Sequence, residues 1–341
     1  MQEKSVRIGL LGFGTVGQGL VKGILSHSDK IVRDLGRNLQ ITKALVRDLT
    51  KEREIEGITL TKNSGDILQD PDIDVIVEVM GNEHPTYSYV KQALLNGKHV
   101  VTANKLLLAI HGVELQEIAY QKGVQLLYEG SVLGGIPILR TIQHGLLGDR
   151  VEELRGILNG TTNFILTQMA ESGKGYEEAL LDAQRAGYAE SDPTMDVSGL
   201  DAACKLVILC RECFDINIRV EDVDISGIQD VSAEEIEEQK KIGCVPKLVA
   251  KASLLYPEAL DFVGLERIKA KVGLEWLPVN DVLSQVSGVD NGLSLRTHLV
   301  GDLFWKGPGA GGLATGGAVL SDVLEVAQRV LLEQRVEIIA K

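Results

Sequence analysis

A lysine and an aspartate lie four residues apart in a stretch that is otherwise almost wholly apolar. Asp201 and Lys205 belong to the segment SGLDAACKLVILC, and a spacing of four places both side chains on the same face of a helix. Charges in such a helix must be paired or functional, because burying an unpaired charge is costly. The pair is therefore either a structural ion pair or an ammonium group that stabilises and protonates a reacting oxygen.

Three carboxylates precede this pair in a loop. The segment RAGYAESDPTMD contains Glu190, Asp192 and Asp196, and it is interrupted by glycine and proline. Acidic side chains beside a lysine suit a cationic ligand that carries an amine. The competing interpretation is a solvated loop in which Asp192 caps a turn at Pro193.

A glycine-rich loop near the N-terminus has the spacing of a phosphate site. In RIGLLGFGTVGQGL the pattern G-x-G-x-x-G follows a predicted strand at 6–11 and precedes a predicted helix, Gln18 to Arg33. Glycines there allow a tight turn and let backbone N–H groups reach a pyrophosphate, and the helix N-terminus adds partial positive charge. We predict dinucleotide binding, with helix–strand packing alone as the alternative. The loop residues assigned to the coenzyme are Gly12, Phe13, Gly14, Thr15, Val16 and Gly17.

The end of the second predicted strand bears on which dinucleotide binds. In ITKALVRDLTKER, Arg47 stands where an acidic residue would accept from the ribose 2′-hydroxyl of NAD, and Lys51 and Arg53 follow. Cations at this place pair with a 2′-phosphate, which favours NADP. Asp48 could instead accept from the ribose 2′-hydroxyl, so NAD stays an alternative coenzyme.

The first 130 residues contain the elements that such a loop requires. Short apolar runs at 6–11, 41–46, 74–80, 98–103 and 124–129 alternate with amphipathic segments. This pattern is typical of strands buried on both faces and joined by crossover helices. It predicts an α/β chain with a Rossmann-type, doubly wound parallel sheet.

Beyond residue 133 the pattern changes to longer helical segments, at 175–187, 199–213 and 232–242, followed by strand-like stretches at 265–279 and 292–307. We expect a second, α+β domain. The predicted boundaries are 1–132 for the dinucleotide-binding domain and 133–302 for the substrate domain. The segment 303–341, apolar at helical spacing, is expected to pack back onto the first domain.

Composition excludes several classes of protein. The chain has 35 Lys plus Arg against 48 Asp plus Glu, a net charge of −13, which disfavours nucleic acid as a partner. No targeting signal and no membrane-spanning stretch is evident. The four cysteines cluster without forming a disulfide framework, and the CREC pair, Cys210 and Cys213, is interpreted as structural thiols. We expect a cytoplasmic protein.

The segment GYAESDPTMDVSGLDAACKL resembles the signature of homoserine dehydrogenase. The resemblance extends in order to HVVTANKLLLA, YEGSVLGGIPIL, LNGTTNFIL and GPGAGGLATGGAVLSDVL, and so over nearly the whole chain. One departure is Asn82, which follows Gly81 where the family often has a second glycine. The sequence stops at 341 without the ACT regulatory domain of longer members, so inhibition by threonine through such a domain is not expected.

The resemblance implies an enzyme that interconverts L-aspartate 4-semialdehyde and L-homoserine with NAD(P)H, in the biosynthesis of threonine, methionine and isoleucine. Lys205 matches the family's proton-donating lysine, Lys105 matches a second lysine near the nicotinamide and substrate, and Asp201 matches an acid of the same pocket. Glu190 matches the residue that holds the substrate's amino group. The further substrate residues are Asp196, Gly160, Thr161 and Tyr188, and the further coenzyme residues are Gly81 and Gly309.

The family also implies a sodium ion and a partner chain. The sodium ligands would be main-chain carbonyls of Glu129, Val132, Gly134 and Ile136, and a homodimer would form through the second domain. Ligation by main-chain carbonyls does not require particular side chains, so the residue types do not test the sodium site.

Two other functions compete with this assignment. An acylating aldehyde dehydrogenase, or another aldehyde or alcohol oxidoreductase on the same scaffold, would need a nucleophilic cysteine with a histidine base if it formed a thiohemiacetal. Cys204 and Cys210 lie in an apolar helical run with no histidine nearby. A non-catalytic, coenzyme-binding regulatory protein would keep the glycine loop but would have no need of a buried Lys205.

Overall fold

The computed structural model describes residues 5–51, 53, 57–255 and 268–339, without the side chains of 334–339. The chain divides into two compact units. The first contains Met1–Gly135 and Gly311–Lys341, and the second contains Ile136–Ala310.

The first unit is built on a parallel sheet. Among the described residues the strand order is β3-β2-β1-β4-β5-β6, and every neighbouring pair is parallel. The order reverses between β1 and β4, the point at which doubly wound sheets bind ligands. The predicted fold class is confirmed. The strands are β1 (Val6–Leu11), β2 (Leu39–Leu45), β3 (Thr59–Thr61), β4 (Val75–Glu78), β5 (His99–Thr102) and β6 (Leu126–Leu127).

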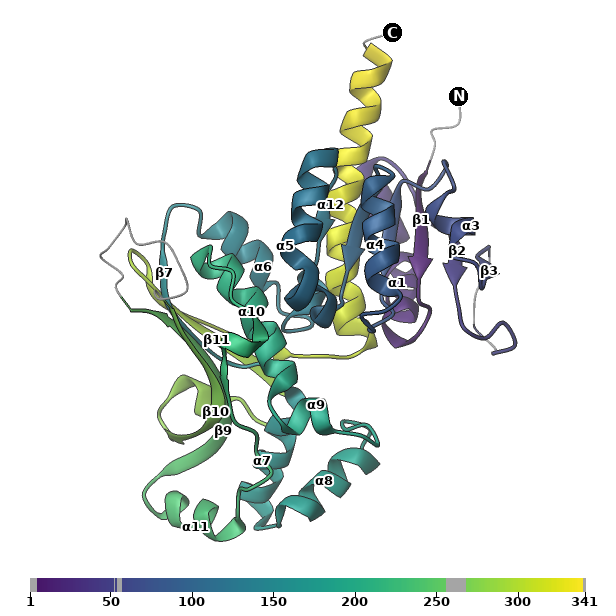
Figure 1. Cartoon of the computed structure of the whole chain (residues 1–341). Helices are drawn as coiled ribbons and strands as arrows, with labels where there is room; N and C mark the ends of the chain where they lie inside the picture. The colour runs from purple at the N-terminus through teal and green to yellow at the C-terminus, as the bar shows by residue number, and fades with distance from the viewer. Residues whose placement is uncertain (1–4, 52, 54–56, 256–267, 340–341) are drawn as a thin grey trace. The chain divides into compact units, whose positions relative to one another are not determined.

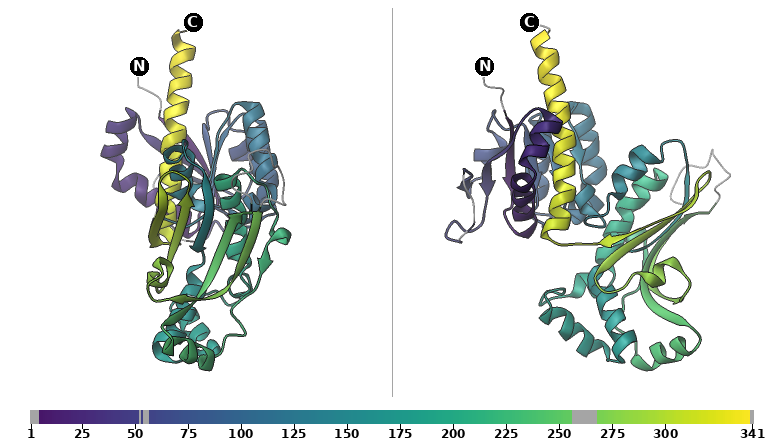
Figure 2. Two further views of the ribbon diagram at one scale, coloured as in Figure 1. Left: turned by 90° about the vertical axis from the view of Figure 1, so that its left-hand side faces the viewer. Right: turned by 180° about the vertical axis from the view of Figure 1, so that it is seen from behind.

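Helices cover both faces of this sheet. Helices α4 and α5 lie on one face, whereas α1 and α12 run side by side on the other (Figures 1 and 2). Apolar residues of α12, among them Val319, Val323 and Ala327, join Ile8 and Leu10 of β1 in one buried core. The helices are α1 (Thr15–Ser26), α2 (Ser28–Leu35), α3 (Gly65–Leu68), α4 (Thr86–Leu95), α5 (Lys105–Lys122) and α12 (Gly312–Ile339).

The single helix predicted from Gln18 to Arg33 is two helices. Helix α1 ends at Ser26, and His27 has left the helical conformation, with φ −119° and ψ 17°. Helix α2 then starts with Asp29 in its first turn and buries Ile31 in the core. The break falls in a polar, exposed stretch, where burial does not reward a continuous helix.

The second unit contains a mixed sheet with strand order β12-β11-β7-β9-β10-β8 among the described residues. Only the β10–β8 pair in this sheet is parallel, again within the described residues. The strands are β7 (Val151–Ile157), β8 (Asp224–Ile225), β9 (Cys244–Leu254), β10 (Ile268–Pro278), β11 (Asp290–Thr297) and β12 (Gly301–Pro308).

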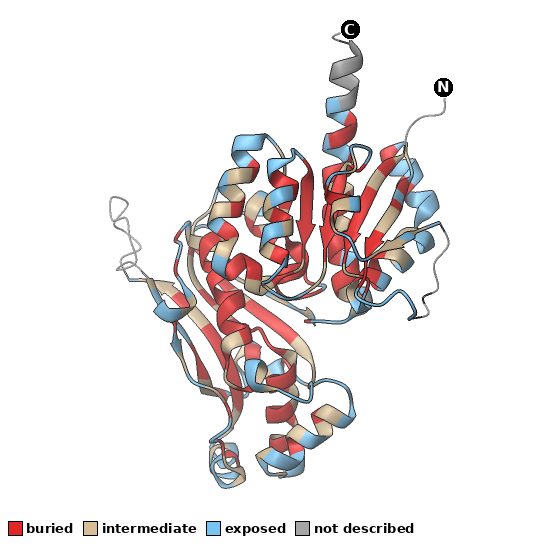
Figure 3. Cartoon of the chain, turned by 45° about the vertical axis from the view of Figure 1, so that its right-hand side comes forward, coloured by how far each residue is buried: buried red, intermediate tan, exposed pale blue. Residues whose placement is uncertain are grey.

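Helix α10 of the second unit contains Asp201 and Lys205. Helix α10 is buried along most of its length (Figure 3), as its apolar sequence predicts. The helices are α6 (Ile138–Arg140), α7 (Gly160–Ser172), α8 (Tyr176–Arg185), α9 (Thr194–Val197), α10 (Leu200–Phe214) and α11 (Ala233–Lys241).

The structure differs from the sequence predictions in the last strands. The stretch predicted at 292–307 is a hairpin of β11 and β12. Residues 303–310 therefore lie in the second unit and not with the C-terminal helix, which begins at Gly312. Of the stretch predicted at 265–279, residues 265–267 lie outside the described residues and β10 covers 268–278.

Candidate active site

The glycine loop joins β1 to α1 in a conformation that side chains would obstruct. Gly12 has φ +95°, and a Cβ there would lie 2.8 Å from the main-chain oxygen of Val79. A Cβ on Gly17 would lie 2.9 Å from the oxygen of Gly12, whereas the space around Gly14, the N-cap of α1, is open. The loop is therefore packed on its inner side and accessible at the helix N-terminus, where a phosphate binds.

A cavity of about 780 Å³ opens beside this loop. It lies at the carboxyl ends of the strands of the first unit, and its volume is in the range of small-molecule sites. Thr15, Val16 and Gly17 form the first turn of α1 behind the loop, and Gly81, at φ +84°, lies between two lining residues. The lining residues are Gly12, Phe13, Gly14, Leu45, Val46, Arg47, Asp48, Lys51, Arg53, Lys62, Val79, Met80, Asn82, Pro85 and Tyr89.

Cationic side chains gather where the cavity meets the end of β2. The predicted residues Arg47, Lys51 and Arg53 all line it, and so does Lys62, which sequence reasoning missed. Lys62 follows β3, and only the pairing of β3 with β2 brings it here. A lone lysine in a short polar turn gave no signal in the sequence.

Asp48 is already engaged within this loop. Its Oδ1 accepts hydrogen bonds from the main-chain N–H and the hydroxyl of Thr50, at 2.8 and 2.7 Å. These bonds lower the pKa of the Asp48 carboxyl. Arg53 donates to the main-chain oxygens of Asp48 and Lys51, while its Nε is buried without a partner among the described residues. That unsatisfied donor, the cations and the open helix N-terminus fit a phosphorylated dinucleotide.

Lys105 is the first residue of α5 and directly follows the helix cap. The Asn104 side chain accepts from the N–H of Leu107 at 3.1 Å and donates to the main-chain oxygen of Asn82 at 2.8 Å. The carboxyl end of β5 and the cavity loop after β4 are thus tied together just before Lys105.

In the second unit, Asp201 and Lys205 form the buried pair that their spacing predicts. Lys205 Nζ lies 2.9 Å from Asp201 Oδ2 and donates to the main-chain oxygen of Leu158 at 2.6 Å. The two residues are 9% and 3% exposed. A lysine ammonium has three N–H donors, so one is left without a partner among the described residues.

Asn159 connects this pair to a second carboxylate. Its Nδ2 donates to Asp201 Oδ2 at 2.8 Å and to Asp196 Oδ1 at 2.6 Å. Its Oδ1 caps α7 by accepting from the N–H of Thr162. In the sequence, Asn159 belongs to the segment LNGTTNFIL. Its cap position could be predicted, but its bonds to two acids could not.

The residues after Asn159 are packed tightly. A Cβ on Gly160 would lie 2.7 Å from the main-chain oxygen of Val289, so this position accepts no side chain without movement. Thr161 donates its hydroxyl to the main-chain oxygen of Tyr188 at 2.7 Å. The Tyr188 ring packs against Phe164 at 5.0 Å between centroids. Thr161 and Tyr188 thus join α7 to the acidic loop.

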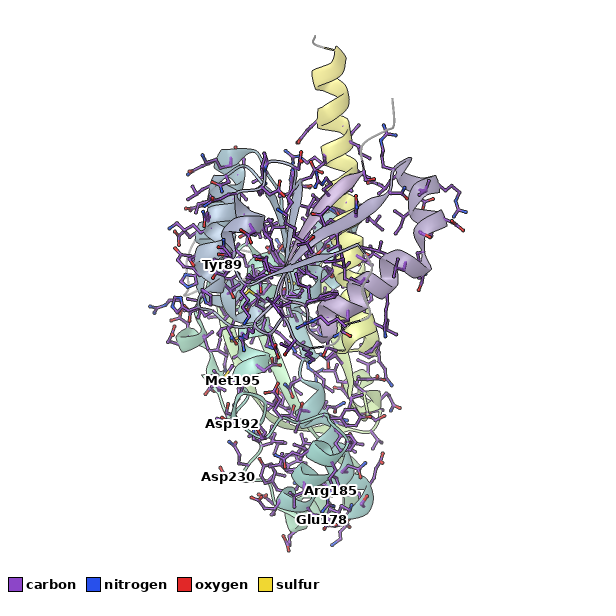
Figure 4. The ribbon with its side chains drawn as sticks, turned by 90° about the vertical axis from the view of Figure 1, so that its right-hand side faces the viewer. Tyr89, Glu178, Arg185, Asp192, Met195 and Asp230 are labelled. Carbon is purple, nitrogen blue, oxygen red and sulfur yellow. The ribbon has the colours of Figure 1, made fainter. Side chains whose placement is uncertain are left out.

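The acidic loop itself is exposed. The Glu190 side chain faces solvent and makes no hydrogen bond to another described residue, although its main-chain oxygen accepts from Gln184. Asp192 accepts from the N–H and hydroxyl of Thr194, which lower the pKa of its carboxyl. Figure 4 shows Asp192 and Met195 at the edge of the unit. The structure brings Asp196, but not Glu190, to the buried pair.

Two family profiles match most of the chain. One, described as homoserine dehydrogenase, matches residues 137–324, and the other, described as the NAD-binding domain of homoserine dehydrogenase, matches residues 12–129. The chain belongs to the homoserine dehydrogenase family.

Individual homoserine dehydrogenases are similar to this chain in sequence and in structure. The enzyme of Bacillus subtilis (strain 168) is 43% identical over 331 residues, which cover 96% of this chain and 74% of that protein. A crystal structure from Thiobacillus denitrificans has a TM-score of 0.90 at 38% identity and covers 95% of this chain and 74% of that one. A hyperthermophilic archaeal enzyme in complex with NADPH has a TM-score of 0.79 at 26% identity, covering 96% and 98%.

Membership of the homoserine dehydrogenase family confirms the predicted function. The protein is an oxidoreductase of amino-acid biosynthesis with a nicotinamide coenzyme domain, so the non-catalytic alternative falls. Burial raises the pKa of the Cys210 thiol, so this cysteine is poorly suited to the thiohemiacetal chemistry of an acylating enzyme. No helix in the described part of the chain has the length and hydropathy needed to span a bilayer.

The remaining predicted residues are Gly309 and members of the segment 129–136. A Cβ on Gly309 would lie 2.0 Å from the side chain of Asn291, so glycine is needed for that contact. Glu129 begins a buried 3₁₀ turn, and its N–H donates to Asp322 of α12 at 2.8 Å. Leu133 and Gly134 then both adopt positive φ, at 51° and 54°. Val132 and Ile136 of the same segment are buried.

Proposed function

We propose that the chain interconverts L-aspartate 4-semialdehyde and L-homoserine with Lys205 as the group that donates and accepts the proton. The observation that carries this assignment is the arrangement at the ammonium group. Asp201 and the Leu158 oxygen fix Nζ with two bonds, and one N–H remains for the substrate oxygen. A buried, oriented donor of this kind is what a developing alkoxide requires.

The reaction follows from that geometry. When bound, the nicotinamide coenzyme supplies a hydride to the aldehyde carbon or takes one up from the alcohol. In reduction, negative charge develops on the carbonyl oxygen, and the remaining N–H of Lys205 donates its proton there to form the hydroxyl of homoserine. In oxidation, the neutral amine accepts that proton. Asp201 stabilises the ammonium form in both directions.

We assign the substrate's amino group to the acidic loop. Glu190 has an exposed carboxylate with no partner among the described residues, as an anchor for a charged amine needs. Asp196, held by Asn159, adds negative charge beside the reacting centre. Gly160, Thr161 and Tyr188 shape the wall between them. Lys105, at the carboxyl end of β5, is proposed to act near the nicotinamide and the substrate.

The preferred coenzyme is proposed to be NADP. Arg47, Lys51, Arg53 and Lys62 line one cavity with the glycine loop, and a 2′-phosphate pairs with cations where a bare ribose hydroxyl needs an acceptor. The Nε of Arg53, buried and without a partner among the described residues, supports the same choice. Gly81 and Gly309 belong to loops proposed to contact the coenzyme.

A sodium ion is proposed at the carbonyls of Glu129, Val132, Gly134 and Ile136. Hard cations take oxygen ligands, and the buried turn with two consecutive left-handed residues supports such a site. Initial rates in NaCl, KCl and choline chloride at equal ionic strength test this. Equal rates in all three salts would contradict the proposed sodium site.

We further propose a cytoplasmic homodimer that forms through the second unit. Four free cysteines support a reducing compartment. Light scattering coupled to size exclusion measures the molecular mass, and a mass near the 36.9 kDa of one chain would contradict the dimer.

The deciding experiment measures NADPH formation at 340 nm with homoserine and NADP⁺. We expect turnover by the wild type and a loss of kcat of about 1,000-fold in Lys205→Met, because general acid–base groups contribute roughly 10²–10⁴-fold. Lys240→Met, in exposed helix α11, is the control and should match the wild type. Equal rates for Lys205→Met and the wild type would contradict the assignment of Lys205 as proton donor. Absence of turnover by the wild type would contradict the proposed reaction.

A further inference from the structure

Glu78 is a fully buried acid at the centre of the parallel sheet. It ends β4, where its register partners are Leu11 of β1 and Thr102 of β5, and its exposure is 0%. Burial of a carboxyl away from cations is costly unless every oxygen has a donor. Hydrogen-bond donors must therefore surround the Glu78 carboxyl.

Neutral groups from two loops surround the Glu78 carboxyl. The N–H of Met80 donates to Oε1 at 2.6 Å, and the hydroxyl of Thr102 donates to Oε2 at 2.5 Å. The backbone of Gly81 and the side chain of Asn104 also lower the pKa of Glu78, although burial dominates and raises it. Within the described residues these partners are uncharged, so a counter-ion does not explain the acid.

These bonds continue beyond the first partners. Thr102 Oγ1 accepts from the N–H of Asn104 at 3.0 Å, which fixes the direction of its own hydroxyl proton. Asn104 caps α5 and donates to the main-chain oxygen of Asn82. The Glu78 carboxyl, Thr102 and Asn104 therefore form one chain of hydrogen bonds between the loop after β4 and the loop after β5.

Both loops carry groups of the proposed site. Met80 and Asn82 line the coenzyme cavity, and Lys105 directly follows Asn104. A fully satisfied buried network rigidifies what it connects, and catalytic groups lose rate when they move by about 1 Å.

We infer that Glu78 is a positioning residue, which sets the coenzyme-binding loop 80–82 and the start of α5 at Lys105 through Thr102 and Asn104. The inference rests on the proposed function for the role of Lys105, but not for its effect on coenzyme binding. Neither oxygen of Glu78 is exposed, so it acts only through its partners.

The test uses three variants and a binding measurement without turnover. Glu78→Leu removes both acceptors at similar volume, and Thr102→Val removes the hydroxyl at constant shape. Thr102→Ser restores the hydroxyl. We expect NADPH, titrated by its own fluorescence, to bind about tenfold more weakly to Glu78→Leu and Thr102→Val, because buried donors lose their acceptors. Thr102→Ser should bind like the wild type.

A stability control separates positioning from general weakening. Val77→Ala creates a cavity in the same strand, where Val77 is 0% exposed, and should lower the melting temperature without changing the NADPH dissociation constant. Hydrogen exchange of the coenzyme-free protein should show faster exchange of the Met80 and Asn104 amides in Thr102→Val but not in Val77→Ala. In turnover, Thr102→Val should lower kcat and leave the KM for homoserine within about twofold.

Some results would overturn the inference. NADPH affinity and amide exchange in Thr102→Val equal to those of the wild type would do so, even if Glu78→Leu failed to fold. If Val77→Ala lost as much NADPH affinity as Thr102→Val, Glu78 would be a stabilising residue and not a positioning residue. If Lys205→Met instead kept full activity, the proton-donor assignment would fail while these binding results stood.

Discussion

Burial separates the roles of the acidic side chains in the second unit. Asp201 is 3% exposed and bonded to Lys205 and Asn159, so its charge is fixed in place and serves the lysine. Asp192 and Glu190 are exposed. Asp192 stabilises its own turn, whereas the Glu190 carboxylate has no described partner and is available to a ligand. Neighbouring acids in one loop thus differ in whether their carboxylates already have partners.

At the residue scale, replacing Glu190 should weaken substrate binding selectively. We expect Glu190→Gln to raise the KM for homoserine roughly tenfold, with kcat within about twofold, because the lost charge pair anchors the amine in ground and transition state alike. Asp192→Asn, which also removes one negative charge from the loop, should leave KM unchanged. Steady-state rates with varied homoserine measure both constants. A selective fall in kcat would show that Glu190 takes part in the chemical step.

Lys62 should discriminate between the two coenzymes. We expect Lys62→Ala to lower kcat/KM with NADP⁺ about tenfold and to leave kcat/KM with NAD⁺ within about threefold, because only NADP⁺ offers a 2′-phosphate. Lys22→Ala removes an equal charge from an exposed position of helix α1 and serves as control. The NADP⁺ effect should shrink at high salt, where exposed charges are screened. Equal losses with both coenzymes would place Lys62 away from the 2′-phosphate.

At the scale of elements, glycine allows α1 and α12 to approach closely. A Cβ on Gly19 would lie 1.8 Å from the main-chain oxygen of Gly312, and one on Gly316 would lie 2.7 Å from the carbonyl carbon of Gly19. A Cβ on Gly23 would meet only the flexible end of Leu320, at 3.1 Å. The helix that carries the phosphate-binding N-terminus is thereby held against the C-terminal helix.

Substitution of these glycines should have opposite effects. Gly19→Ala should destabilise the first unit by about 1–3 kcal/mol or more, because the backbone of α12 must move. Gly23→Ala should be neutral or stabilise by up to about 1 kcal/mol, since alanine favours the helix. Far-UV circular dichroism during urea unfolding measures both stabilities. Tryptophan fluorescence would not report on the first unit, because Trp276 and Trp305 lie in the second unit. A neutral Gly19→Ala would show that the two helices are not closely packed.

At the scale of the whole molecule, a buried lysine makes folding depend on pH. Lys247 of β9 is 4% exposed and donates to Asn163 and to the main-chain oxygen of Val286. Burial lowers its pKa from 10.5 to about 8. Between these values Lys247 binds more protons in the unfolded chain than in the folded one, so its contribution to the free energy of unfolding rises with pH.

Comparison with an uncharged variant isolates this contribution. From pH 7.5 to 10, the free energy of unfolding of the wild type should gain roughly 2–3 kcal/mol over that of Lys247→Met, at about 1.4 kcal/mol per pKa unit. Lys251→Met, in the same strand with a side chain 42% exposed, should run parallel to the wild type. Trp276 reports the transition, because it pairs with Pro246 beside Lys247. Parallel curves for all three proteins would mean that the pKa of Lys247 is not lowered in the folded state.

The sequence by itself determined the features that depend on local spacing. Apolar runs and the glycine pattern determined the parallel sheet and the place of the phosphate loop, because periodicity and backbone freedom are local properties. A spacing of four placed Asp201 and Lys205 on one helix face. Residue types alone left open whether that pair was structural or catalytic, and the family resemblance gave the reaction.

Only the tertiary structure decided which distant groups meet. Asn159 reaches both Asp196 and Asp201, Lys62 joins the cations after β2, and Glu78 connects two loops through Thr102. The break at His27 and the hairpin of β11 and β12 were also decided there. Such contacts join residues far apart in sequence, and their energy depends on strand order and packing, which no local pattern specifies.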